Sequence, residues 1–141
     1  MVDRSVVLAK VAAIEQGLDR LRYARDPATS LSERDRRDIV ELNLQRATQS
    51  AISLAHHVAS TEGWGLPARA SEVFDVLAER GILSADLADR LKRMVGFRNV
   101  LVHRYEEVDP AIVESILEHH LGDLESFAAA ILEGFGLREG A

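Results

Sequence analysis

Arg98 and His103 stand five positions apart in the segment RNVLVHRY, residues 98–105, which also carries Asn99 and Tyr105. A histidine side chain exchanges protons near neutral pH, because its ordinary pKa is about 6.5. An arginine side chain keeps its positive charge and presents a planar fork of N–H donors that fits the oxygens of a phosphate. Such a pair could perform acid–base chemistry beside an anionic group whose charge grows during the reaction.

The spacing places these side chains on different faces of an ideal helix. Asn99 and His103 are four residues apart and share a face, whereas Arg98 and His103 are about 140° apart. If the helix ends near Val102, His103 leaves it at its end. The alternative interpretation is structural, with Arg98 and Arg104 as surface residues and His103 as a core or helix-capping histidine.

The composition narrows the class of protein. The chain has 141 residues, of which 47% are hydrophobic, and this suits a single domain over residues 1–141. The absence of cysteine excludes a thiol nucleophile, a cysteine zinc site and a disulfide framework. Lys10 and Glu15 interrupt the N-terminal apolar run, and no later segment approaches the length of a membrane span. We therefore expect a cytoplasmic protein that does not associate with membranes.

Most of the chain is predicted to be helical. Apolar side chains recur at alternating spacings of four and three residues, the pattern of packed amphipathic helices. The segments with this pattern span residues 7–21, 40–58, 87–94 and 113–131, and a shorter helical segment spans residues 71–81. No segment alternates for long like a strand. The sequence thus predicts an all-α, up-and-down four-helix bundle with one additional short helix.

Local signals mark the expected helix boundaries. Asp26 precedes Pro27 and should end the first helix, because a residue before proline is disfavoured in the helical conformation. Ser30 and Glu33 could form a capping box for the second helix. One last helix is expected to reach Ile131, with His120 interrupting its apolar stripe. Other boundaries are predicted at Gly81, Ser84, Asp109 and Pro110.

Charge is sorted along the second half of the chain. Residues 90–104 contain five basic residues and no acidic one, whereas residues 106–133 contain eight acidic residues and no Lys or Arg. The net charge of −6 argues against nonspecific binding of nucleic acid by the chain as a whole. The positive block is therefore where we expect an anionic partner. Its members are Arg90, Lys92, Arg93, Arg98 and Arg104.

The Arg-x4-His spacing on the penultimate helix of a small helical domain resembles the motif of the HEPN superfamily. The longer pattern, Arg98-x4-His103-x-Tyr105, resembles the HepT toxins of bacterial and archaeal toxin–antitoxin pairs. The likeness covers roughly residues 3–133. It includes the long second helix, the Gly/Pro loop after it, the short helix VFDVLAERGIL and the Asp-Pro entry into the last helix.

This resemblance implies a metal-independent endoribonuclease toxin that acts as a homodimer and needs no cofactor. By position, Arg98 and His103 would be catalytic and Asn99 would support them. The implied partner is a minimal nucleotidyltransferase antitoxin of the MntA type, which would silence the toxin by transferring AMP to Tyr105. Within the positive block, the candidate RNA contacts are Arg90, Lys92, Arg93 and Arg104.

The residue chemistry agrees with that implication. RNA cleavage without a metal uses the 2′-hydroxyl as an internal nucleophile and leaves a 2′,3′-cyclic phosphate. The reaction needs groups that move protons and a fixed cation at the phosphate. Because one chain offers a single motif histidine, a dimer that brings His103 of both protomers into one cleft would supply both an acid and a base.

Two other functions remain open from the sequence. The chain could be a non-catalytic HEPN binding module that docks a nucleotidyltransferase and modulates it, or a helical dimer with a purely structural role. We expect no metal site at His56-His57 or His119-His120, because adjacent helical positions point about 100° apart. Trp64 is interpreted as an anchor that closes one end of the helical domain. A solvated, ion-paired face is expected around Arg20, Arg22, Arg25, Arg34, Arg36 and Arg37.

Overall fold

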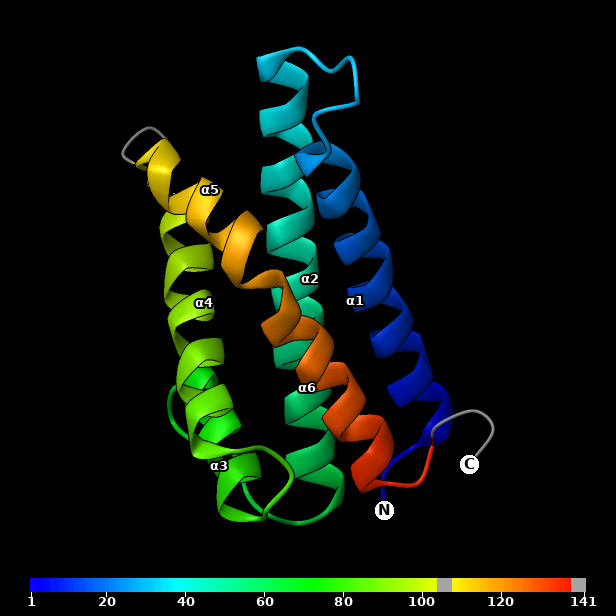
Figure 1. Ribbon diagram of the computed structural model, residues 1–141. Helices are drawn as coiled ribbons and strands as arrows, with labels where there is room; N and C mark the ends of the chain where they lie inside the picture. The colour runs from blue at the N-terminus through cyan, green and yellow to red at the C-terminus, as the bar shows by residue number, and fades with distance from the viewer. Residues whose placement is uncertain (104–107, 138–141) are drawn as a thin grey trace.

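The computed structural model describes residues 1–103 and 108–137, which form helices with no strand among them (Figure 1). The expectation of an all-α protein is confirmed. In these residues, no helix has the length and apolar character needed to cross a membrane. The elements are α1 (Arg4–Arg25), α2 (Glu33–Thr61), the 3-10 helix η1 (Ala70–Glu72), α3 (Val73–Glu79), α4 (Ala85–His103), α5 (Pro110–His119) and α6 (Leu121–Gly134).

Side-chain caps explain where several helices begin. Asp109 accepts a hydrogen bond from the Ala111 amide at 2.9 Å, and the predicted start of α5 at Pro110 is confirmed. The predicted capping box at Ser30 is wrong. Ser32 immediately precedes the first residue of α2, and its hydroxyl accepts a hydrogen bond from the Asp35 amide at 3.1 Å.

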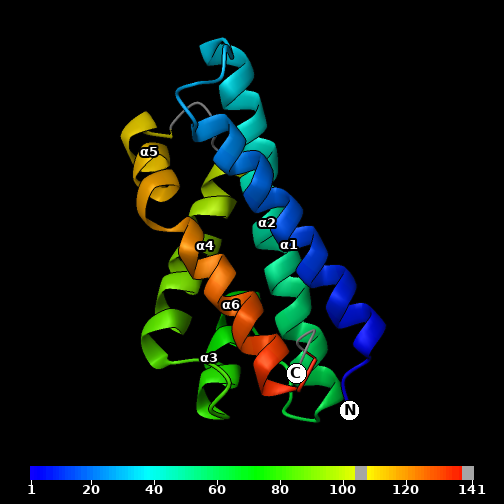
Figure 2. The same ribbon diagram turned by 45° about the vertical axis from the view of Figure 1, so that its right-hand side comes forward.

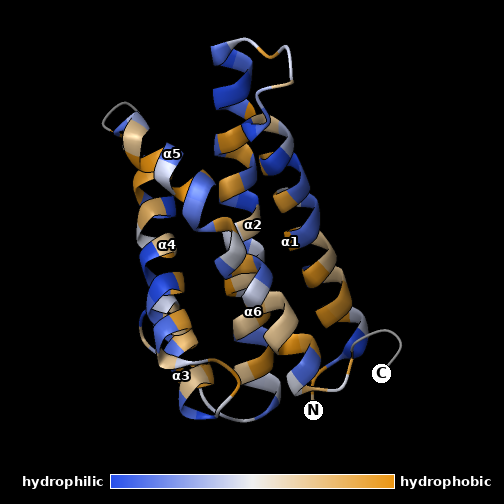
Figure 3. Ribbon diagram, viewed as in Figure 1, coloured by the Kyte–Doolittle hydropathy of each residue, from blue (hydrophilic) through white to orange (hydrophobic). Residues whose placement is uncertain are grey.

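The long helices α1 and α2 pack antiparallel to each other, and α2 is the central helix, because α4 and α6 also pack against it (Figures 1 and 2). Gly17 lets α1 approach α2 closely, because a Cβ atom at this position would lie 2.9 Å from the Cβ of Ala47. The apolar faces of the helices turn inward (Figure 3). Phe74 of α3 and Phe127 of α6 meet edge to face, with 5.5 Å between ring centroids.

The last segment is not the single helix that the sequence predicted. It breaks at His120, which separates α5 from α6 and has φ of −121° and ψ of −2°. One arginine at the end of α1 and one near the start of α2 bind α5. Arg25 donates a hydrogen bond to the Leu117 carbonyl at 2.8 Å, and Arg36 forms an ion pair with Glu114 at 2.6 Å. The protein therefore has one more helix in this segment than expected.

Candidate active site on helix α4

Three of the four Lys and Arg side chains of α4 are paired with carboxylates. Arg90 lies 3.2 Å from Asp86 of the same helix and 3.3 Å from Asp123 of α6. Lys92 contacts Asp75 of α3 at 2.9 Å, and this hydrogen bond raises the pKa of Lys92 above its ordinary value. The third pair joins Arg93 and Asp89 at 2.9 Å.

These ion pairs divide the positive block that the sequence indicated. Arg90 is directed toward α6 and Lys92 toward α3, so the two cations serve different neighbours on different sides of α4. Arg93 is exposed but pairs with a carboxylate one helical turn away. Arg104 lies outside the described residues. The structure therefore brings together no continuous strip of unpaired cations from Arg90 to Arg98.

Arg98 differs from the other cations of α4. Its Nη1 donates a hydrogen bond to the Oδ1 of Asn99 at 3.1 Å, and it has no carboxylate partner within residues 1–103 and 108–137. The side chain is half-buried, and its Nε is shielded from solvent with no hydrogen-bond partner in that same part of the chain. A guanidinium held by a neutral amide keeps its charge available for an anion.

His103 is the last residue of α4 and is exposed. The alternative interpretation of a core histidine is therefore wrong, and α4 continues one residue beyond the expected end at Val102. Asn99, Val100 and Val102 are also exposed around it, the two valines at 41% and 42%. The imidazole is thus accessible to a substrate, on a surface that also presents apolar side chains.

Helix geometry separates Arg98 from His103. Five residues correspond to about 7.5 Å along an α-helix and about 140° around it. One chain therefore presents the guanidinium and the imidazole on different faces of α4. Tyr105, the third member of the motif, lies outside the described residues.

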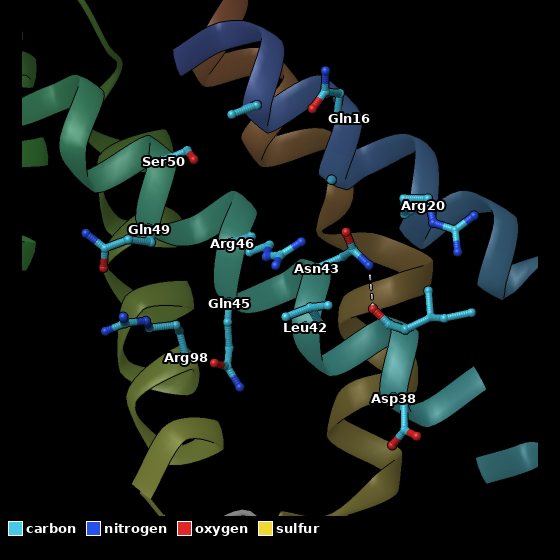
Figure 4. A pocket seen from close by; sticks show the side chains of 13 residues that line it. Gln16, Arg20, Asp38, Leu42, Asn43, Gln45, Arg46, Gln49, Ser50 and Arg98 are labelled. Carbon is cyan, nitrogen blue, oxygen red and sulfur yellow. Dashed lines mark hydrogen bonds between the residues drawn. The ribbon is translucent and has the colours of Figure 1, made fainter. Parts of the chain in front are cut away.

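Arg98 lines an open groove of about 910 Å³ that α1, α2 and the second half of α4 form (Figure 4). Arg20 of α1 and Arg46 of α2 also line it, and among the residues that the structure describes Asp38 is the single acidic side chain on its wall. In Figure 4, Arg46 lies between Arg20 and Arg98 in the view shown. The other polar residues of the wall are Gln16, Asn43, Gln45, Gln49 and Ser50.

Sequence reasoning missed the placement of Arg20 and Arg46 in this groove. The sequence predicts Arg20 to lie on an ion-paired face and makes no prediction for Arg46. Other arginines of that predicted face do form ion pairs. Arg22 contacts Glu125 of α6 at 2.7 Å, and Arg36 contacts Glu114 of α5 as well as Glu33 of its own helix. Arg20 instead lies over the ring of Tyr23, 5.0 Å from its centroid.

The histidine pairs and Trp64 have local structural contacts. His57 accepts a hydrogen bond from the Asp3 amide at 3.1 Å, and His120 lies 3.1 Å from Asp123. No group of three His, Asp or Glu side chains suited to a metal ion occurs in the described segments. Trp64 packs against the core, and the guanidinium of Arg80 lies 5.5 Å from its ring centroid, as expected for an anchor.

Comparisons with known proteins identify the family. The chain matches the family described as Ribonuclease HepT-like over residues 14–131. It is 32% identical over 127 residues to the mRNA nuclease HepT of Shewanella oneidensis, and this match covers 89% of this chain and 96% of that protein. It is 30% identical over 111 residues to the tRNA nuclease HepT of Aphanizomenon flos-aquae, covering 77% of this chain and 76% of the relative.

A solved structure agrees with these sequence matches. The tri-AMPylated HEPN toxin of Shewanella oneidensis, in complex with the MNT antitoxin, superimposes with a TM-score of 0.83 at 32% identity. The match covers 91% of this chain and 97% of that toxin chain. The resemblance to the HepT toxins of the HEPN superfamily is thereby confirmed. The chain belongs to the HepT-like ribonuclease family.

Proposed function

We propose that this chain, as a single domain, is the toxin of a toxin–antitoxin pair and cleaves RNA without a metal ion. Its relatives include an mRNA nuclease and a tRNA nuclease, and a toxin of similar fold occurs in complex with an antitoxin. The proposal assigns catalysis to Arg98 and His103, support to Asn99 and the regulatory modification to Tyr105.

The observation that carries the proposal is the environment of Arg98. Carboxylates neutralise the other Lys and Arg side chains of α4, whereas the partner of Arg98 is the neutral amide of Asn99. A permanent cation that is half-buried and lines an open groove can bind a phosphate and stabilise the charge that develops on it. Exposed His103, one and a half turns further along α4, adds a group that can transfer protons.

The proposed reaction is an internal transesterification. A neutral His103 imidazole accepts the proton of the ribose 2′-hydroxyl while the 2′-oxygen attacks the adjacent phosphorus. The bond from phosphorus to the 5′-oxygen breaks, and that oxygen receives a proton from an imidazolium. The products are a 2′,3′-cyclic phosphate and a 5′-hydroxyl, and the guanidinium of Arg98 stabilises the negative charge on the phosphoryl oxygens.

A dimer would provide the two proton-transfer groups that this reaction requires. Each chain has one motif histidine, and helix geometry separates His103 from Arg98 of the same chain by about 140°. We propose that two protomers place their α4 ends along one cleft. One His103 would then act as the base and the other as the acid, with Arg98 of either protomer at the phosphate.

The first test is RNA cleavage by the purified chain in the presence of EDTA. We expect cleavage to persist, because the proposed proton transfers and charge stabilisation come from side chains alone, and the new ends should be 2′,3′-cyclic phosphates. Intact mass must first show that the sample carries no AMP. An unmodified chain that leaves RNA intact would contradict the nuclease and favour a non-catalytic module that docks a nucleotidyltransferase.

The second test addresses silencing through Tyr105. Incubation with an MntA-type nucleotidyltransferase, ATP and magnesium should add AMP to the chain and abolish cleavage, because a phosphate and a bulky base would compete with RNA near Arg98. The Tyr105→Phe chain should keep its mass and its nuclease activity. Tyr23→Phe is the matched control, since the chain has only two tyrosines and Tyr23 is exposed on α1. A Tyr105→Phe chain that is silenced as completely as the wild type would exclude this mechanism.

A further inference from the structure

We infer that the groove between α1, α2 and α4 binds single-stranded RNA next to the cleaved bond, with Arg20 and Arg46 as its phosphate-binding residues. This inference rests on the proposed function, because Arg98 is the member of the groove that would contact the reacting phosphate. Arg20 and Arg46 would hold phosphates further along the same strand.

The charge of the groove is opposite to that of the chain. Of the charged side chains in residues 1–103 and 108–137, three arginines and one aspartate line it, on a protein whose net charge is −6. Within the described residues, neither Arg20 nor Arg46 pairs with a carboxylate, and both are exposed. RNA is a polyanion. Arginines without an existing ion pair can bind its phosphates without first losing the free energy of that pair.

Two other hollows formed by the described residues lack this property. The groove between α1 and α6, about 380 Å³ in volume, is lined by three carboxylates and one arginine. The hollow between α4 and α5 contains Arg90 and Arg93, but both are already paired with aspartates. Compared with these two hollows, the groove that holds Arg98 has arginines that no carboxylate of the described residues neutralises.

The neutral side chains of the groove favour RNA over an acidic protein as its occupant. Gln16, Gln45 and Gln49 present amides that can both donate and accept hydrogen bonds, which suits ribose hydroxyls and base edges. Leu42 offers an exposed apolar contact at 47% exposure in the same wall. An open groove of about 910 Å³ with three cations from three helices matches a backbone-tracking site for a single strand.

The test measures binding separately from cleavage. The probe is a short fluorescent 2′-O-methyl RNA strand, which lacks the attacking hydroxyl and cannot be cut by the proposed reaction. Anisotropy gives its Kd at several salt concentrations for the wild type and for the Arg20→Gln/Arg46→Gln chain. Glutamine has a helix propensity close to that of arginine, so the exposed substitutions should leave the fold intact.

The control is the Arg4→Gln/Arg69→Gln chain, which removes the same charge. Both residues are exposed: Arg4 is the first residue of α1, and Arg69 immediately precedes η1 in the connection between α2 and α3. In Figure 1 the N-terminus and this connection lie at the same end of the fold. We expect the groove variant to bind at least about tenfold more weakly, with its log–log salt slope reduced by about 1.4, or about 0.7 for each lost phosphate contact. The control should remain within about twofold of the wild type.

Each other outcome has a definite meaning. If both double variants bind the RNA equally weakly, the loss of affinity comes from the net charge of the chain and not from the groove, which would overturn the inference. Unchanged RNA affinity in the groove variant would overturn it too. Sedimentation of the same samples covers a third case. Loss of the dimer with unchanged RNA affinity would make the groove a protein interface and likewise overturn it.

The inference and the proposed function can fail separately. If the wild type binds the probe through the groove but leaves ordinary RNA uncut, the nuclease fails and the groove stands. If the wild type cuts RNA while the Arg20→Gln/Arg46→Gln chain keeps its Kd and its KM, the groove fails and the nuclease stands.

Discussion

Replacing His103 with alanine is expected to lower the rate of RNA cleavage in EDTA by about 10²–10⁴-fold, the usual contribution of a general acid or base. The upper end of this range applies if both protomers of a dimer contribute the residue, because the substitution then removes the acid and the base together. Stability should change by no more than about 0.5 kcal/mol, since His103 is exposed at the end of α4. Single-turnover rates with a labelled RNA and thermal unfolding of the same samples measure both effects.

His119→Ala is the control for this substitution. His119 is also an exposed histidine at the end of a helix, and its neighbour Glu118 lies 3.6 Å away. It should leave the rate unchanged. Comparable losses in the two variants would mean that the chain responds to loss of any histidine, and full activity of the His103→Ala chain would remove this residue from the mechanism.

The fold was predictable where local signals determine it. The apolar periodicity located the long helices, and the Asp109-Pro110 pair located the start of α5, because caps act on neighbouring amides. His120 interrupts the apolar stripe of the last segment, but this local signal alone does not predict that the helix ends there. The break accompanies the bond from Arg25 to the Leu117 carbonyl and the ion pair of Arg36 with Glu114, which join residues far apart in the sequence.

The candidate site likewise has features that the sequence predicts and features that depend on contacts between distant segments. The spacing of Arg98 and His103 could be read directly, because both lie on one helix. The ion pair of Lys92 could not be predicted from the sequence, since its partner Asp75 is 17 positions away on another helix. Residues 90–104 are indeed a block of basic residues, but the acids that pair with three of them all lie outside it, at Asp75, Asp86, Asp89 and Asp123.

The groove arginines do share a local signal. Arg20, Arg46 and Arg98 have no Asp or Glu three or four positions away, unlike Arg90 and Arg93. An arginine without such a neighbour cannot form an ion pair one turn away on its own helix, so it is neutralised only where an acid from elsewhere in the fold reaches it. This signal alone does not show which arginines line the groove, because other basic residues share it. They are Arg4, Lys10, Arg25, Arg80 and Arg138.

Arg98 carries the second large prediction. The Arg98→Gln chain should lose about 10²–10³-fold in kcat, the usual cost of removing one preorganised donor from a developing oxyanion. Its KM should rise less, because the charge on the phosphoryl oxygens is greatest in the transition state. Arg93→Gln is the control: Arg93 lies on the same helix, is exposed and pairs with Asp89, so its loss should change kcat little.

Arg98→Lys separates charge from geometry. Lysine keeps the positive charge but replaces the planar fork with a single ammonium, so it cannot hold Asn99 and two phosphoryl oxygens in the same arrangement. We therefore expect the Arg98→Lys chain to bind the 2′-O-methyl RNA nearly as well as the wild type, yet to cleave RNA almost as slowly as Arg98→Gln. Wild-type kcat in the lysine variant would show that a point charge is sufficient. A rise in KM alone in both variants would make Arg98 a binding residue of the groove, leaving His103 without a cationic partner on its own helix.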